Sequence, residues 1–168
     1  MSDDRILIGE GFVGEGVNAA HINTVMGKRS GPVGTAWVTA LATPRVGHVP
    51  FVAVATPGSP IVPFTLFVNK ATIEDDAHGN LTWGAAQAGL AAGVGQAHID
   101  GHMPSDCDDY VLIAAVWVNP GANDEEEVFA NNRAATLSAL AMARSGATEM
   151  TAALAAMVHP TNPYFRRS

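Results

Sequence analysis

A strand-like segment over residues 64–73 ends in polar side chains that could do chemistry. Alternation places Phe64, Leu66, Val68, Lys70 and Thr72 on one face, so an ammonium and a hydroxyl continue an apolar surface. Lys70 is one of only two lysines in the chain. These groups could hold polar parts of a ligand. A lysine could also form an imine with a carbonyl compound if burial lowered its pKa.

A second pair of polar residues lies in the strand expected over residues 18–26. His21 and Asn23 share one face. The opposite face is apolar, with Ala20, Ile22 and Met26. An imidazole with an unperturbed pKa near 6.5 suits general acid catalysis.

Gln87 is a third candidate, on the helix expected over residues 83–98. It shares a stripe with Trp83, Leu90 and Val94, so its amide has apolar neighbours. The simplest structural interpretations of these polar residues are a strand end, a solvent-exposed face and a hydrogen-bonded core amide. Alternation within each element does not show which elements are neighbours.

Two other patterns are better explained by structural roles than by ligand binding. The string from Gly9 to Gly14 matches G-x-G-x-x-G, but a strand follows where a nucleotide-binding helix would open, so a hairpin with flexible turns explains it. Possible metal ligands gather between residues 98 and 109, but Gly101 and Pro104 interrupt any helix that would align them, and we expect a solvated loop without metal. Those ligands would be His98, His102, Asp106, Cys107, Asp108 and Asp109.

The composition excludes several classes of function. The net charge is -7, from 16 acidic and 9 basic residues, which argues against nucleic-acid binding. A single cysteine, Cys107, suits a reducing compartment. We expect neither a signal peptide nor a membrane span, and therefore a cytoplasmic protein. Only 15% of the residues are charged, below the usual quarter or so, which indicates a homo-oligomer.

The elements needed to position these residues fit one mixed α/β domain over residues 1–168. Strands are expected over 6–13, 18–26, 49–55, 64–73 and 110–118, and helices over 34–41, 83–98 and from Asn123 to about Arg144. Asn123 is the expected helix cap, followed by acids at the positive end of the helix dipole. An Ala/Met-rich segment and a proline-punctuated tail follow.

Four segments, in order, resemble the formaldehyde-activating enzyme family. They are GEGFVGEGVNAAHINTVMG (9–27), FVAVATPGSPIVPFTLFVNKATI (51–73), WGAAQAGLAAGV (83–94) and DDYVLIAAVWV (108–118). The FVNKATI and WGAAQAG strings are the specific ones, and the likeness thins after about Gly146. The resemblance implies a fold like the second domain of ribosomal protein S5. It also implies a homopentamer with a pterin held near a subunit boundary.

The family's activity would be condensation of formaldehyde with tetrahydromethanopterin, or a related reduced pterin, a hydro-lyase reaction of one-carbon metabolism, methylotrophy and formaldehyde detoxification. By this resemblance His21 would be the catalytic residue, and the substrate-binding residues would be Asn23, Val52, Lys70, Thr72 and Gln87. Val52 stands where the family has leucine. The reduced pterin would be a co-substrate, and no cofactor would be permanently bound.

The sequence departs from the family at Asn23, where a carboxylate is usual. Asparagine is neutral, so the affinity for the carrier or the share of protonated His21 is expected to fall. Two alternatives stay open beside condensation. One is a non-catalytic homologue that binds a pterin or formaldehyde as a sensor or buffer. The other uses Lys70 as an imine-forming nucleophile on another carbonyl substrate.

Overall fold

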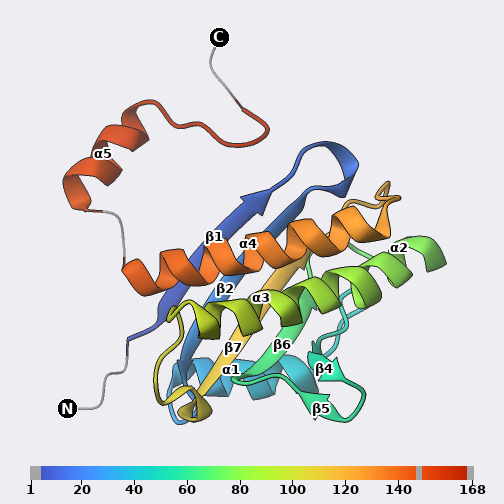
Figure 1. The fold of residues 1–168 in the computed structure, drawn as a ribbon, viewed down its shortest axis with the longest axis horizontal. Coiled ribbons are helices and arrows are strands. Elements are labelled where there is room, and N and C mark those ends of the chain that lie inside the picture. The colour runs from blue at the N-terminus through green and yellow to red at the C-terminus, as the bar shows by residue number, and fades with distance from the viewer. Residues whose placement is uncertain (1–4, 147–148, 166–168) are drawn as a thin grey trace.

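A five-stranded sheet forms the centre of the protein in the computed structural model, which describes residues 5–146 and 149–165 (Figure 1). The strand order is β1-β2-β7-β6-β3. These strands are β1 (Leu7–Val13), β2 (Ala20–Lys28), β7 (Tyr110–Trp117), β6 (Phe64–Asn69) and β3 (Phe51–Val52). β6 and β7 are parallel, whereas the other neighbours are antiparallel. The sheet is mixed, so the predicted α/β class is confirmed.

Helices cover the two faces of the sheet unequally (Figure 1). α3 (Gln87–Ile99) and α4 (Glu125–Ser145) lie across one face, and the shorter α1 (Pro32–Ala42) packs on part of the other. α2 (Asp76–Asn80) leads through a π-helical segment (Leu81–Ala86) into α3, so this helical stretch begins earlier than predicted. A ribbon of β4 (Val54–Thr56) and β5 (Ser59–Pro60) follows β3. The strand expected over residues 49–55 is thus divided at Ala53.

The cap of α4 differs from the prediction. Asp124 is the N-cap, and its carboxylate accepts a hydrogen bond from the Glu127 N–H at 2.9 Å. Asn123 lies one residue earlier, where its backbone N–H donates to the side chain of Asn18. The prediction that Asn123 caps the helix was therefore wrong by one residue. The carboxylate of Asp124, one position later, is better placed to accept from the free N–H groups at the start of the helix.

The glycines of β1 allow α4 to approach the sheet closely. A Cβ at Gly9 would lie 1.8 Å from the carbonyl oxygen of Ala139, and one at Gly11 would lie 2.1 Å from that of Ala135. The predicted hairpin is confirmed by the antiparallel pairing of β1 with β2. Gly9 and Gly11, however, serve helix–sheet packing and not turn flexibility.

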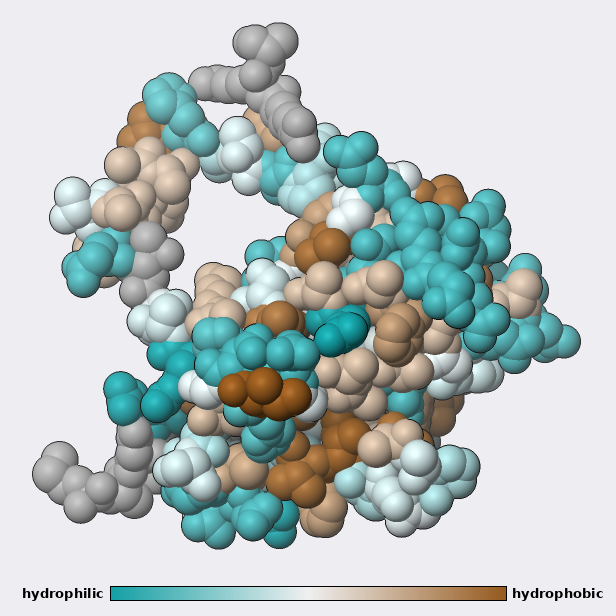
Figure 2. Space-filling view, viewed as in Figure 1, coloured by the Kyte–Doolittle hydropathy of each residue, from teal (hydrophilic) through white to brown (hydrophobic). Residues whose placement is uncertain are grey.

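The C-terminal part of the chain leaves the body. α5 (Met150–Val158) has no fully buried residue, and Figure 2 shows it as a separate mass with open space between it and the body. Of the described helices, none combines the length and apolar character needed to cross a membrane.

Candidate functional site

The sheet face opposite α3 and α4 carries the predicted histidine and asparagine. We call it the open face. Along β2 the side chains alternate, with Ala20 and Ile22 fully buried and His21 and Asn23 partly exposed. The predicted division of this strand into two faces is confirmed.

The pairing of β2 with its neighbours sets what surrounds these two residues. His21 lies opposite Phe12 of β1 and Trp117 of β7. Asn23 lies opposite Glu10 and Ala115. Because directly opposed residues of antiparallel strands share a face, all of these side chains belong to the open face.

Lys70 reaches across β7 to both predicted residues of β2. Its backbone N–H donates to the carbonyl of Val116 at 2.8 Å, which anchors it just after the end of β6. Its Nζ lies 2.5 Å from Asn23 Oδ1 and 3.4 Å from His21 Nδ1. The side chain that β7 places beside Asn23 is Ala115, which is small enough to let the lysine pass. The structure therefore brings His21, Asn23 and Lys70 into one cluster.

A fourth member of this cluster, Glu10, was not predicted. Its Oε1 lies 3.0 Å from Nε2 of His21, on the opposite side of the ring from Lys70. Glu10 sits in the glycine string that was interpreted only as a hairpin. The available signal was strand alternation, which places Glu10 and Phe12 on one face and Gly9 and Gly11 on the other.

The pKa values within the cluster are displaced by burial and by neighbouring charges. Partial burial, followed by the Lys70 ammonium, lowers the pKa of His21 below its ordinary 6.5, and the Glu10 carboxylate opposes both. Burial likewise lowers the pKa of Lys70 below 10.5, again opposed by Glu10. Burial thus lowers both pKa values, and the Lys70 ammonium adds to the effect on His21. The cluster holds a proton donor, a cation and an amide within reach of one another.

The other three predicted residues lie toward the β3 side of the sheet. Val52 pairs with Leu66 in the β3–β6 ladder. The Thr72 hydroxyl lies 3.4 Å from Nε2 of His48. Among the contacts of the described residues, none joins Val52, Thr72 or Gln87 to the cluster around His21.

The Gln87 side chain bonds to the backbone of β4. Its Oε1 accepts from the Val54 N–H at 3.0 Å, and its Nε2 donates to the Val54 carbonyl at 3.2 Å. The side chain is also buried. Within one chain, the Gln87 amide therefore links α3 to β4.

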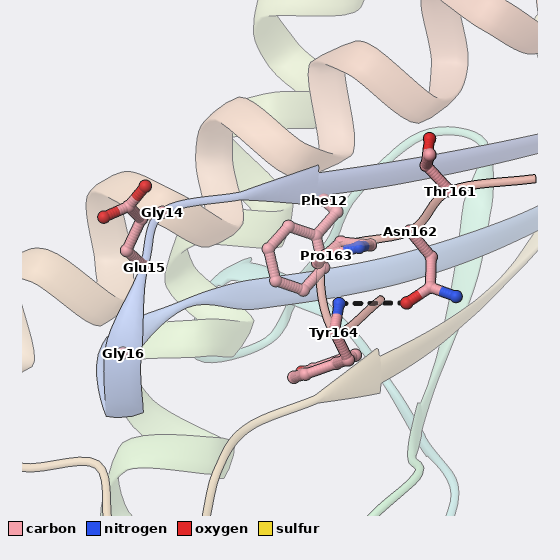
Figure 3. Close-up of a pocket in the computed structure, with 8 residues that line it drawn as sticks. All are labelled: Phe12, Gly14, Glu15, Gly16, Thr161, Asn162, Pro163 and Tyr164. Atoms are coloured by element: carbon pink, nitrogen blue, oxygen red, sulfur yellow. Dashed lines mark hydrogen bonds between the residues drawn. The ribbon is translucent and has the colours of Figure 1, made fainter. Parts of the chain in front are cut away.

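The C-terminal tail returns to the open face at Tyr164 (Figure 3). The ring of Tyr164 packs edge-on against Phe12, at 5.9 Å between centroids, and against Trp117, at 6.4 Å. The Phe12 ring also contacts His21 at 5.8 Å. The tail and the β1–β2 turn line an open pocket of about 690 Å³, and the six predicted site residues are not among those lining it. Its lining is Phe12, Gly14, Glu15, Gly16, Thr161, Asn162, Pro163 and Tyr164.

Two of the possible metal ligands of residues 98–109 have other partners. His98 Nε2 lies 2.7 Å from the carbonyl of Val62, and Asp106 pairs with Lys28. Within the described residues, no group of three or more His, Cys, Asp or Glu side chains is arranged to hold a metal ion.

Comparison with known proteins places these observations in a family. A family model described as formaldehyde-activating enzyme matches residues 8–164. The chain is also 37% identical to a 5,6,7,8-tetrahydromethanopterin hydro-lyase of Methanosarcina barkeri, over 95% of this chain and 90% of the relative. This chain belongs to the formaldehyde-activating enzyme family.

Other relatives are longer than this chain, which matches only part of each of them. A bifunctional enzyme Fae/Hps of Methanocella arvoryzae is 37% identical over 81% of this chain, but the match covers 35% of the relative. The corresponding enzyme of Archaeoglobus fulgidus is 35% identical over 77% of this chain and 33% of the relative. This chain spans about a third of these bifunctional relatives and most of the hydro-lyase.

Proposed function

We propose that this protein condenses formaldehyde with tetrahydromethanopterin, forming the methylene derivative and water. The observation that carries the proposal is the cluster on the open face, where His21 and Lys70 lie within 3.4 Å of each other. Membership of the family and the name of the hydro-lyase relative support it.

The mechanism follows from the chemistry of the two substrates. A carrier amine adds to formaldehyde and gives a carbinolamine. The hydroxyl of that adduct leaves as water only when it receives a proton. A second amine of the carrier then attacks the iminium carbon left behind and loses a proton, which gives the methylene derivative. The His21 imidazolium donates this proton, while Lys70 and Asn23 hold the formaldehyde oxygen and the polar edge of the pterin. General acid catalysis contributes roughly 10²–10⁴-fold, and holding the two reactants together contributes further.

The remaining predicted residues would contact the carrier from a second side. Val52 would pack on the pterin ring, and Thr72 and Gln87 would hydrogen-bond to it. Their separation from the His21 cluster within one chain supports a site at a subunit boundary, where the two groups come from different copies. Gln87 would bond to the carrier through whatever hydrogen-bonding capacity its contacts with Val54 leave free.

The proposed assembly is a cytoplasmic homopentamer that holds no permanently bound cofactor. The low content of charged residues supports an oligomer, and so does α5. Met150, Leu154 and Met157 of that helix are 72%, 55% and 71% exposed in the single chain. Apolar surface of this kind is usually covered in the functional assembly.

The test is the rate of methylene-carrier formation above the spontaneous reaction. His21→Gln should reduce the enzymatic contribution roughly 10²–10⁴-fold while tetrahydromethanopterin still binds. Binding by the unaltered protein without any acceleration would contradict condensation and favour the non-catalytic sensor or buffer.

A second candidate function has one observation in its favour. Burial lowers the pKa of Lys70, and this increases the share of neutral amine able to attack a carbonyl. Borohydride would then trap an adduct on Lys70. Lys28, the other lysine, is an internal control because its contact with Asp106 raises its pKa. Labelling of Lys70 but not Lys28 would support imine chemistry, and equal labelling would contradict it.

A further inference from the structure

Glu10 contacts the one ring nitrogen of His21 that Lys70 does not approach. In the β1–β2 ladder Glu10 lies opposite Asn23, one step diagonally from His21 on the open face. Its carboxylate reaches Nε2 of His21 at 3.0 Å, while Nζ of Lys70 lies 3.4 Å from Nδ1. The imidazole is thus held between an anion and a cation.

These two contacts specify where the proton of the neutral ring resides. An ammonium donates hydrogen bonds and accepts none, so Nδ1 facing Lys70 is the acceptor nitrogen. A carboxylate only accepts, so Nε2 facing Glu10 carries the hydrogen. One tautomer of His21 satisfies both contacts.

The charge balance of the cluster also depends on Glu10. Lys70 donates to the amide oxygen of Asn23, a neutral group that does not compensate the ammonium. A second positive charge on His21 would therefore be repelled by Lys70. The Glu10 carboxylate, whose side chain is 48% exposed, offsets this repulsion.

We propose that Glu10 is a positioning residue of the condensing site, which fixes the Nε2–H tautomer of His21 and supplies the negative charge that Asn23 lacks. The proposal rests on the proposed function insofar as His21 is the general acid. The control of His21 by Glu10 does not depend on that reaction.

The decisive experiment is a pH titration of the His21 ring in ¹⁵N-histidine-labelled protein, with its signals assigned by their loss in His21→Gln. In Glu10→Gln the titration should move to lower pH. In Glu10→Ala, which also removes the acceptor oxygen, the ring-nitrogen shifts should show a reduced preference for Nε2–H. The condensation rate at pH 7 should fall about tenfold, as expected from removal of an opposite charge in hydrogen-bond contact. The affinity for tetrahydromethanopterin should be retained.

Glu15→Gln is the matched control, because it removes the same charge from the exposed turn of the same hairpin. It should leave the titration of His21 unchanged. If Glu10→Gln titrates like Glu15→Gln and Glu10→Ala keeps the ring-nitrogen shifts of the unaltered protein, the proposal is wrong, whatever the condensation rates of these variants. If the unaltered protein does not condense formaldehyde, the proposed function fails while this titration still decides the role of Glu10.

A double variant separates charge from orientation. Asn23→Asp in the Glu10→Ala background returns a carboxylate to the contact with Lys70. The His21 titration should move back toward that of the unaltered protein, while the tautomer preference stays reduced, because nothing replaces the acceptor at Nε2. A titration that stays at low pH would overturn the charge role, and a recovered tautomer would overturn the orienting role.

Discussion

At residue 23, this chain has an asparagine where a carboxylate is usual in the family. The Asn23 amide lies beside the Lys70 ammonium and the His21 imidazole. Asn23→Asp would place an anion 2.5 Å from Lys70 Nζ and beside His21. We expect it to raise the pKa of His21, increase the share of imidazolium at neutral pH and raise the condensation rate by up to about tenfold. Asn80→Asp, an exposed change of the same charge, is the control. No gain over that control would contradict this account of the substitution.

The pH dependence of the rate gives a test at the same scale. His21 must be protonated to act as an acid, so the catalysed rate should fall as the pH rises through its pKa. Burial and Lys70 lower that pKa, so the midpoint of the fall should lie below 6.5. Lys70→Gln removes a positive charge, and the midpoint should then move to higher pH. Rate profiles of the two proteins check this, and movement to lower pH would contradict it.

Alternation predicted which way His21, Asn23 and Lys70 point, because it is a local property of one strand. Their contact was not predictable from it, since β7 lies between β2 and β6 in the sheet but follows both in the chain. Glu10 escaped notice because the Gly9–Gly14 string was interpreted only as part of a hairpin. Gln87 was predicted from an apolar stripe, and that pattern alone could not show its bonds to Val54.

At the scale of elements, two glycines of α3 have opposite roles. A Cβ at Gly93 would lie 2.7 Å from the backbone oxygen of Arg133 in α4, whereas one at Gly95 would meet nothing within 4 Å. Gly93→Ala should lower the free energy of unfolding by about 1–3 kcal/mol, because the helices must separate. Gly95→Ala should raise it by up to about 1 kcal/mol through helix propensity. Denaturant unfolding of both variants provides the measurement, and equal effects would contradict the packing argument.

Helix propensity alone predicts that a glycine weakens a helix, and that reasoning applies to Gly95. It missed the reason for Gly93, which exists only once α4 lies against α3. The same holds for Gly9 and Gly11 in β1. Helix propensity is a property of one element, whereas the close approach of two elements depends on both. The sequence pattern therefore predicted the helix but not the element that packs against it.

At the scale of the whole molecule, apolar side chains remain uncovered on several elements. Ile8 of β1 is 65% exposed, and Trp83 is 47% exposed at the start of the long helical stretch. The low charge content predicted a shortage of polar surface, and the structure shows where the uncovered apolar surface lies. How many copies cover it is a property of geometry between chains, which neither composition nor a single chain specifies.

The exposed face of α5 permits a direct test of the proposed assembly. Met150, Leu154 and Met157 share one side of this helix, and burying each side chain between subunits would contribute about 1.5–3 kcal/mol. Leu154→Glu with Met157→Glu would instead place unpaired carboxylates in that interface, at a cost of several kcal/mol more. The mass by light scattering should then fall from a multiple of 17.4 kDa toward a single chain. Ala152→Glu with Ala156→Glu adds the same charge on the opposite side of α5 and should preserve the assembly. Equal masses for the two double variants would mean that this face of α5 does not join subunits, and the covering surface would have to be sought on β1 or the Trp83 region.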